Sequence, residues 1–94
     1  MTIVVLSDTP DMTTEQYDKV AAEIGLTRSL PTGCLAYVAG LGPDATTWRD
    51  LSVWESAAQA KQFMDETLRP AMERHGATVI WGPPTTWEAH QLIT

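Results

Sequence analysis

The order of strand-like and helix-like segments along the chain constrains its fold more than any other feature of the sequence. Residues 2–7, TIVVLS, are apolar and β-branched and are followed by the loop residues DTPDM, which predicts a first strand. Residues 13–25 have helical periodicity: Thr13 and Gln16 have the spacing of a capping box, and Gly25 ends the run. The chain is therefore expected to begin with a strand and an amphipathic helix.

A predicted hairpin follows this first helix. Residues 34–42, CLAYVAGLG, and residues 46–56, TTWRDLSVWES, both have strand composition. The PDAT turn between them leaves a loop of about four or five residues, a usual length for a hairpin connection. These two segments are expected to be neighbouring antiparallel strands.

A second helix is predicted directly after the hairpin. Ser56 and Gln59 repeat the capping-box spacing, and an apolar stripe follows at helical intervals. Pro70 lacks an amide hydrogen and clashes with the preceding turn of a helix. We therefore expect a first helical segment to about Leu68 and a short second one through residues 71–76, AMERHG.

The end of the chain supplies the last predicted strand. TVIW and a rigid GPP precede residues 85–93, TTWEAHQLI, whose alternation places Glu88, His90 and Leu92 on one face. The resulting order, strand–helix–strand–strand–helix–strand, predicts an α+β, ferredoxin-like fold over residues 1–94 as a single domain. In this fold a four-stranded antiparallel sheet carries both helices on one face.

Charge and cysteine content exclude several classes of function. Six Lys and Arg against twelve Asp and Glu give a net charge of -6 with no basic run, so neither nucleic acid nor an anionic membrane is expected as a partner. The apolar run at the start of the chain is too short for a signal peptide or a spanning helix, and no positive charge precedes it. This predicts a cytoplasmic protein. The single cysteine, Cys34, has no neighbours that suggest a zinc site.

The stretch TTWRDLSVWES contains the first candidate site residues. As a strand it places Trp48, Asp50, Ser52 and Trp54 on one face, so Asp50 would lie between two indoles. In such a pocket desolvation would raise the pKa of Asp50 and allow it to act as a general base. The alternative is that Asp50 forms an ion pair or occupies a solvated edge position.

Four features occur together in this chain: a hairpin, the junction VWES, an amphipathic helix after it and the closing WEAHQLI. In this combination the chain resembles the dimeric α/β-barrel superfamily, which includes the antibiotic-biosynthesis monooxygenases. The resemblance implies a homodimer whose sheets pack face to face, with a pocket on the helix-free face of the sheet. It also implies a catalytic strand Trp, matched by Trp54, and an Asn four residues earlier. That position is Asp50 here, and the chain contains no asparagine.

Haem-degrading members of the superfamily use a His on the second helix as an iron ligand. The nearest candidate, His75, lies beyond Pro70 and out of the required register. A solvated position in the last turn of the helix, favourable to the helix dipole, is the simpler interpretation. We therefore predict no metal, haem or other cofactor.

Other candidates lie on the remaining strands. His90 could act as an acid or base with Glu88 as its orienting partner, or be a hydrogen-bonded surface residue. Trp81, with the other three tryptophans, could line a slot for a planar aromatic ligand or fill a dimer interface. Tyr37 and Ser52 could add hydroxyl groups to a pocket or make structural hydrogen bonds.

Two functions stay open from the sequence. One is a small cofactor-independent enzyme that acts on an aromatic or polyketide-like molecule by proton transfer, cyclisation or oxygenation. The other is a non-catalytic homodimer that binds a hydrophobic small molecule or serves as an accessory protein. The fold hosts both kinds of function, so the fold alone does not decide between them. An enclosed cavity containing Asp50 or His90 would favour the enzyme.

Overall fold

A computed structural model describes residues 1–77 and 84–94 of the chain. The elements are β1 (Ile3–Pro10), α1 (Thr14–Ile24), β2 (Cys34–Leu41), β3 (Thr47–Trp54), α2 (Ala57–Phe63), η1 (Met64–Leu68), α3 (Arg69–Arg74) and β4 (Thr85–Glu88). The segment TVIW, with Trp81, lies outside the described residues. Within the described part of the chain, no helix is long and apolar enough to cross a membrane.

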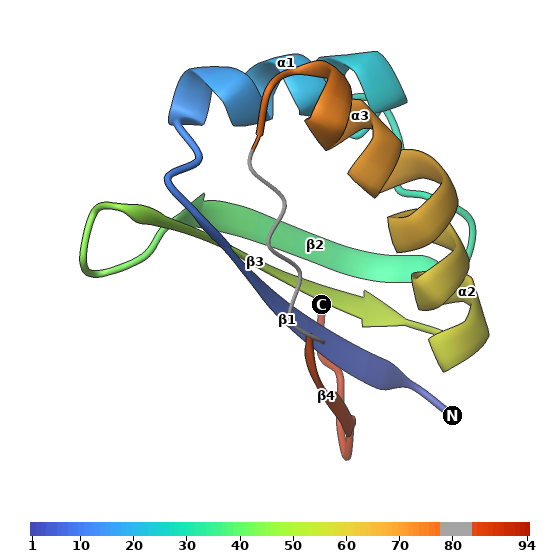
Figure 1. The fold of residues 1–94 in the computed structure, drawn as a ribbon. Helices are drawn as coiled ribbons and strands as arrows, with labels where there is room; N and C mark the ends of the chain where they lie inside the picture. The colour runs from blue at the N-terminus through green and yellow to red at the C-terminus, as the bar shows by residue number, and fades with distance from the viewer. Residues whose placement is uncertain (78–83) are drawn as a thin grey trace.

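The four strands form one antiparallel sheet in the order β2-β3-β1-β4. All helices lie on one side of this sheet, and the other side carries none of the described helices (Figure 1). The predicted ferredoxin-like α+β fold is confirmed, as is the hairpin between β2 and β3, whose loop spans residues 42–46. β1 and β3 are the two central strands, so their inward faces form the floor of the core.

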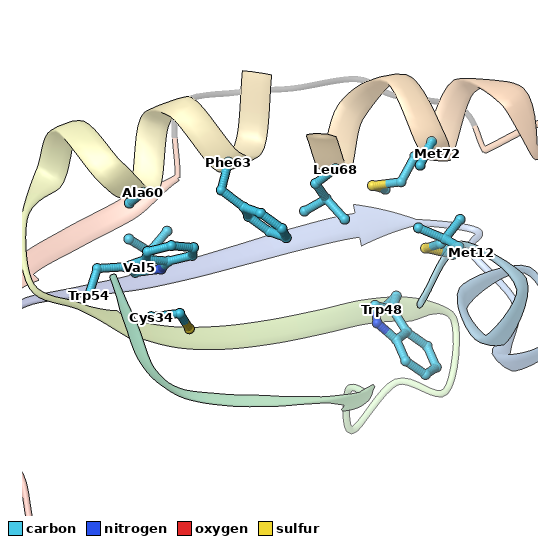
Figure 2. Close-up of a cluster of buried hydrophobic side chains, with 11 residues drawn as sticks. Val5, Met12, Cys34, Trp48, Trp54, Ala60, Phe63, Leu68 and Met72 are labelled. Atoms are coloured by element: carbon cyan, nitrogen blue, oxygen red, sulfur yellow. The ribbon is translucent and has the colours of Figure 1, made fainter. Parts of the chain in front are cut away.

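The core lies between this floor and the second helical run (Figure 2). Trp54 is only 1% exposed and packs against Phe63 of α2, with ring centroids 5.3 Å apart. Val5 of β1 and Leu68 of η1 belong to the same buried cluster. Full burial of such side chains contributes about 1.5 to 3 kcal/mol each. The contact between α2 and the β1–β3 floor therefore holds the two layers together.

Both predicted helix starts are confirmed. The Thr13 hydroxyl accepts a hydrogen bond from the Gln16 backbone N–H at 3.1 Å, and the Thr13 N–H donates to the Gln16 side chain at 3.0 Å. Gly25 ends α1 in the left-handed conformation with φ of 80°, which a residue without Cβ adopts readily. At the second helix, the Ser56 hydroxyl accepts from the Gln59 N–H at 3.2 Å.

The second helical run is divided near Pro70, as predicted, but it does not stop there. A π-helical turn, η1, separates α2 from α3, and its last bond runs from the Arg69 N–H to the Met64 carbonyl. Pro70 lies in the first turn of α3, directly after η1, the part of a helix in which proline is best tolerated. The wider turn lets the chain continue through Pro70 in helical conformation.

The last strand is shorter than predicted. β4 ends at Glu88, so His90 lies beyond the strand, and the shared face of Glu88, His90 and Leu92 is not formed. The final ladder contact of this edge is the Ala89 N–H, which donates to the Thr2 carbonyl at 2.9 Å. β4 pairs only with Ile3 to Leu6 of β1, and residues after Ala89 have no such partner strand in the described chain.

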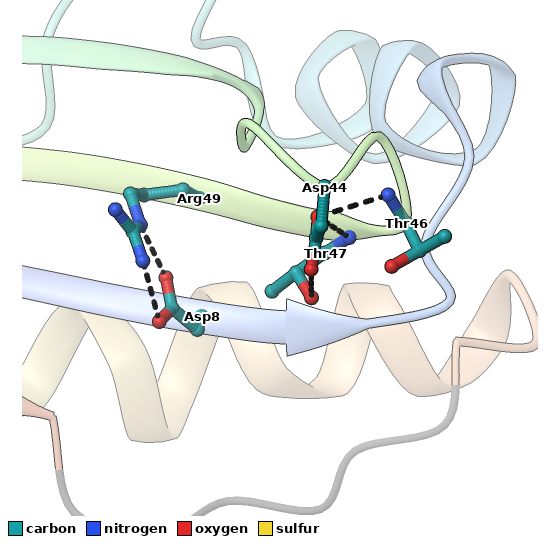
Figure 3. Close-up of polar contacts among 5 residues, drawn as sticks. All are labelled: Asp8, Asp44, Thr46, Thr47 and Arg49. Atoms are coloured by element: carbon teal, nitrogen blue, oxygen red, sulfur yellow. Dashed lines mark hydrogen bonds and ion pairs between the residues drawn. The ribbon is translucent and has the colours of Figure 1, made fainter.

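The hairpin loop and the helix-free face are held by short polar contacts (Figure 3). The Asp44 carboxylate accepts hydrogen bonds from the N–H groups of Thr46 and Thr47, each at 3.0 Å, which lowers the pKa of Asp44 to about 2. Asp8 of β1 accepts a bidentate pair of bonds from Arg49 of β3, the shorter at 2.8 Å. Asp8 and Arg49 are register partners, so this pair marks the helix-free face.

The capping box at Thr13 yields a stability prediction. Thr13→Ala removes the acceptor of the Gln16 N–H and should lower the free energy of unfolding by about 1 kcal/mol. Thr14→Ala changes the adjacent exposed residue, whose hydroxyl makes no cap, and should leave stability within about 0.5 kcal/mol. Urea denaturation of both variants provides the comparison, and equal losses would contradict a specific role for the cap.

Candidate functional site

The face that carries Trp48, Asp50, Ser52 and Trp54 points toward the helices. All four residues are buried, and in the register Ser7 of β1 lies opposite Asp50 while Val5 lies opposite Ser52. The expectation that they line a pocket on the helix-free face is therefore wrong. The reason is visible on the opposite face, where Arg49 and Asp8 form an exposed ion pair that suits solvent better than the core.

Asp50 is the central polar group of this buried face. It is 7% exposed, and no hydrogen bond or ion pair to its carboxylate is found among the described residues. Desolvation by burial, with a smaller contribution from the charge of Asp8, raises the pKa of Asp50 from 3.8 to about 7. Asp50 is buried and has no ion-pair partner among the described residues, so neither a solvated edge position nor an ion pair is found for it there. A carboxyl group in this state can take up or release a proton near neutral pH.

Hydroxyl groups from three further elements gather around Asp50. Ser7 of β1 and Tyr37 of β2 each have a buried side-chain oxygen with no hydrogen-bond partner in the described chain. Tyr17 of α1 lies close enough to Asp50 and Tyr37 for both to influence its pKa, which burial raises most. The pKa of Tyr37 is also raised, first by burial and then by the charge of Asp50. Both phenols therefore stay protonated.

The two tryptophans of this face differ in their contacts. The Trp54 indole N–H donates to the Ser52 hydroxyl at 2.7 Å, so both groups are engaged within the core. The Trp48 ring stacks on Tyr17 with centroids 4.5 Å apart, and its buried N–H has no acceptor among the described residues. The open hydrogen-bonding capacity of the cluster therefore lies on the side of Trp48 and Tyr37.

The histidine candidates are not part of this cluster. His90 and Glu88 are both exposed. Glu88 is the last residue of β4 and lies opposite Ile3, two positions along the same face from Val5 and four from Ser7, and His90 follows β4. His75 caps α3, and its Nε2 lies 3.4 Å from a Glu23 carboxylate oxygen. Among the described residues, no group of three or more His, Cys, Asp or Glu side chains is placed to hold a metal ion.

A separate cavity of about 600 Å³ lies between the second helical run and the β1–β4 edge of the sheet. Its apolar wall includes Ile3 and Val5 of β1 and Ala57, Ala60 and Met64 of the helical run. Asp50 is not in this wall. The sequence did contain a signal, since these helical residues form the apolar stripe, but a stripe of this kind is also what core packing requires.

Comparisons with known proteins support the fold. No family model matches the chain, and no curated protein does. A solved structure from Chloroflexus aurantiacus, assigned to the antibiotic biosynthesis monooxygenases, has a TM-score of 0.66 at 17% identity, with 100% of this chain and 98% of that one covered. SnoaB from Streptomyces nogalater, a cofactor-independent oxygenase, has a TM-score of 0.60 at 14% identity, with 98% and 95% covered.

A third structure, a protein from Deinococcus radiodurans assigned to the same family, has a TM-score of 0.62 at 16% identity, with 100% of this chain and 97% of that one covered. The chain has the fold of the antibiotic-biosynthesis monooxygenases. The similarity that VWES and the closing WEAHQLI predicted is thus confirmed over the full length of the chain. Identities this low carry the fold and leave the chemistry to the residues of the site.

The raised pKa of Asp50 predicts how stability varies with pH. Between pH 4 and pH 7 the folded state holds a proton that the unfolded state has released, so unfolding becomes easier as pH rises through this window. The shift corresponds to about 4 kcal/mol. Asp50→Asn removes this dependence, so the variant should gain stability relative to the parent by an amount that grows from pH 4 to pH 7. Urea titrations across this range measure the difference, and a pH-independent difference would contradict it.

Proposed function

We propose that this chain is a small cofactor-independent enzyme that moves a proton on an aromatic or polyketide-like molecule, with Asp50 as the general base. The observation that carries the proposal is the buried carboxyl of Asp50, which has no partner among the described residues and a pKa of about 7. Structural carboxylates are usually paired or solvated, whereas a base poised near neutral pH is what proton abstraction requires.

The groups around Asp50 suit the anion that such a step creates. When Asp50 accepts a proton from a substrate C–H or O–H, negative charge moves onto a substrate oxygen. The hydroxyl of Ser7 is a buried donor without an acceptor in the described chain, so it can donate to that oxygen, and the hydroxyl of Tyr37 lies beside that of Tyr17. Tyr17 and Trp48, stacked on each other, offer an aromatic wall beside it. An electron-rich anion formed in this way is also the species that can react with oxygen.

Trp54 has a supporting part in this proposal. Its indole N–H donates a hydrogen bond to Ser52, and its ring packs on Phe63, so Trp54 fixes the packing of the strand that carries Asp50. The same contacts favour the second candidate function, a non-catalytic binding or accessory protein, because they leave the tryptophan that matches the family's catalytic position without a free donor. The first candidate function requires turnover that depends on Asp50, whereas the second requires no turnover.

We further propose that the helix-free face is covered by a second copy of the chain. Val38 is 61% exposed and Trp87 is 45% exposed on this face, beside the half-buried Leu6 and Leu51. A face with such apolar side chains is unusual for a surface in permanent contact with water. A two-fold axis would pair it with itself and bring the Asp8–Arg49 ion pair of each copy into the interface.

The catalytic proposal is tested with Asp50→Asn and with anthrone, an aromatic ketone whose methylene proton can be removed to give a stabilised anion. In deuterated buffer without oxygen, the parent should accelerate exchange of this proton, and Asp50→Asn should lose about a hundredfold or more of that acceleration. For the parent, kcat/KM should fall tenfold per pH unit below about pH 7, because the base must be ionised. Proton NMR follows the exchange.

Two controls separate chemistry from structure. Glu15→Gln removes a carboxylate that is exposed on α1 and should change kcat/KM no more than a few-fold. Repeating the reaction in air with an oxygen electrode distinguishes proton transfer alone from oxygenation. Equal turnover by the parent and Asp50→Asn would contradict the role of Asp50 as the base, whereas no exchange with a panel of such ketones would support the non-catalytic binding protein.

The assembly proposal predicts a mass of about twice the 10.3 kDa chain by light scattering at micromolar concentration. Val38→Asp places a charge on the helix-free face and should shift the protein to the monomer, since an unpaired charge in an interface is strongly unfavourable. Leu30→Asp is the matched control, because Leu30 is also exposed but lies in the loop between α1 and β2. A monomeric parent would contradict the proposal.

A further inference from the structure

Asp50 is closed off from solvent in the arrangement that the structure shows. Its carboxyl is buried, and so are Ser7, which lies opposite it on β1, and Trp48, which precedes it on the same face of β3. Asp50 is not in the wall of the cavity beside α2 either. A general base must come within hydrogen-bond reach of the proton that it removes, at about 2.6 to 3.2 Å. The proposed reaction therefore requires part of the layer that covers Asp50 to move.

The start of α1 covers this end of the sheet. In Figure 2, Trp48 and Met12, which shortly precedes α1, lie at the opposite end of the core from Trp54. The ring of Tyr17 stacks on Trp48 with centroids 4.5 Å apart. The phenol of Tyr17 is also close enough to Asp50 for the charge of the carboxylate to act on it. Tyr17 therefore lies over the part of β3 that carries the candidate base.

The two halves of α1 are held in different ways. The backbone of the helix lies against α3 and η1. In the second half, Val20 is fully buried, and the Glu23 carboxylate accepts a hydrogen bond from Arg74 of α3, with the Arg74 Nε at 3.2 Å. At the start of the helix, residues 13–15 are exposed, so the first half depends on Tyr17 for much of its contact with the sheet. The second half is thus an anchor, and the first half is more weakly attached.

The connection from β1 to α1 contains a backbone position suited to a hinge. Asp11 has a φ of 59°, in the left-handed region that residues other than glycine seldom adopt. Its N–H donates to the Thr46 carbonyl at 3.0 Å, which fixes this point against the β2–β3 loop. Residues at the ends of elements commonly absorb the backbone rotation when a covering segment opens, and backbone strain is found at such positions. Residues 12–17 therefore lie between a fixed turn and an anchored half-helix.

We propose that residues 12–17 form a lid over Asp50, and that Tyr17 closes this lid by stacking on Trp48. The proposal rests on the proposed function for the identity of the admitted molecule as substrate. Opening separates the ring of Tyr17 from Trp48 and uncovers the carboxyl of Asp50. Val20 and the ion pair to α3 stay in place, so the opening is local and exposes only a small part of the core.

The lid is tested by measuring how fast a thiol at the covered position reacts with iodoacetamide. Asp50→Cys supplies this thiol, and Cys34, which is buried and lies opposite Trp54 at the other end of the core, is an internal control in the same chain. Peptide mass spectrometry gives the alkylation rate of each thiol. Adding Tyr17→Ala should raise the rate at the introduced thiol about tenfold or more, because the stacking ring is lost. The rate at Cys34 should stay within about threefold.

Tyr17→Phe is the matched control, because it keeps the ring and removes only the hydroxyl. It should leave both alkylation rates within about threefold of those in the Asp50→Cys protein. Equal acceleration of both thiols by Tyr17→Ala would show a general loosening of the core, and acceleration of neither would show that Tyr17 does not close the site. Either result would overturn the lid. If Tyr17→Ala does not fold, Tyr17→Leu applies the same test.

A second measurement needs no change at Tyr17. The alkylation rate of the thiol introduced by Asp50→Cys is followed in urea concentrations well below the unfolding midpoint. A local opening exposes little surface, so the rate should depend on urea far less than the equilibrium constant for unfolding of the same protein does. Equal dependence on urea would mean that Asp50 is reached only by global unfolding, which would also overturn the lid.

These outcomes are distinct from those of the catalytic test, because alkylation uses no substrate. Local opening together with equal anthrone exchange by the parent and Asp50→Asn would support the lid and overturn the role of Asp50 as base. Anthrone exchange that depends on Asp50, together with alkylation only through global unfolding, would overturn the lid and leave that role standing.

Discussion

The burial of Trp54 between the β1–β3 floor and α2 is the contact on which the rest of the structure depends. Its indole is nearly inaccessible to solvent, its ring meets Phe63, and its N–H is bonded to Ser52 of the same strand. A buried indole N–H without an acceptor would carry a desolvation penalty of about 1 to 3 kcal/mol. Ser52 removes that penalty, so the large ring can fix the helical layer without a polar defect.

This contact also decides which face of β3 is inside. Successive side chains of a strand point to opposite faces, so burying Trp54 also buries Ser52, Asp50 and Trp48. The carboxyl of Asp50 is therefore placed in the core by the packing of its neighbours. No hydrogen bond to this carboxylate is found among the described residues, so none of them accounts for its position. Buried ionisable groups without partners are rare in cores whose only role is packing, which is why such a group indicates a functional site.

The order of elements could be predicted because local signals agreed with the fold. The caps at Thr13 and Ser56 and the breakers Gly25 and Pro70 mark boundaries that the structure reproduces, since capping and proline geometry act within one turn of the chain. The end of the last strand could not be predicted from alternation. Strand length depends on the pairing available, and the hydrogen-bonded register with β1 extends only to Glu88.

Which face of β3 points toward the core likewise could not be predicted from the sequence of this strand alone, because both of its faces mix polar and apolar residues. The deciding information is in the pairing of two strands: Asp8 opposite Arg49 puts opposite charges on one face, while Ser7 opposite Asp50 puts small and acidic groups on the other. An exposed ion pair is tolerated at little cost, whereas burying Arg49 in place of Asp50 would require a guanidinium to be desolvated. A carboxyl can instead become neutral when buried, and this difference explains why the acidic residue is the one that faces the core.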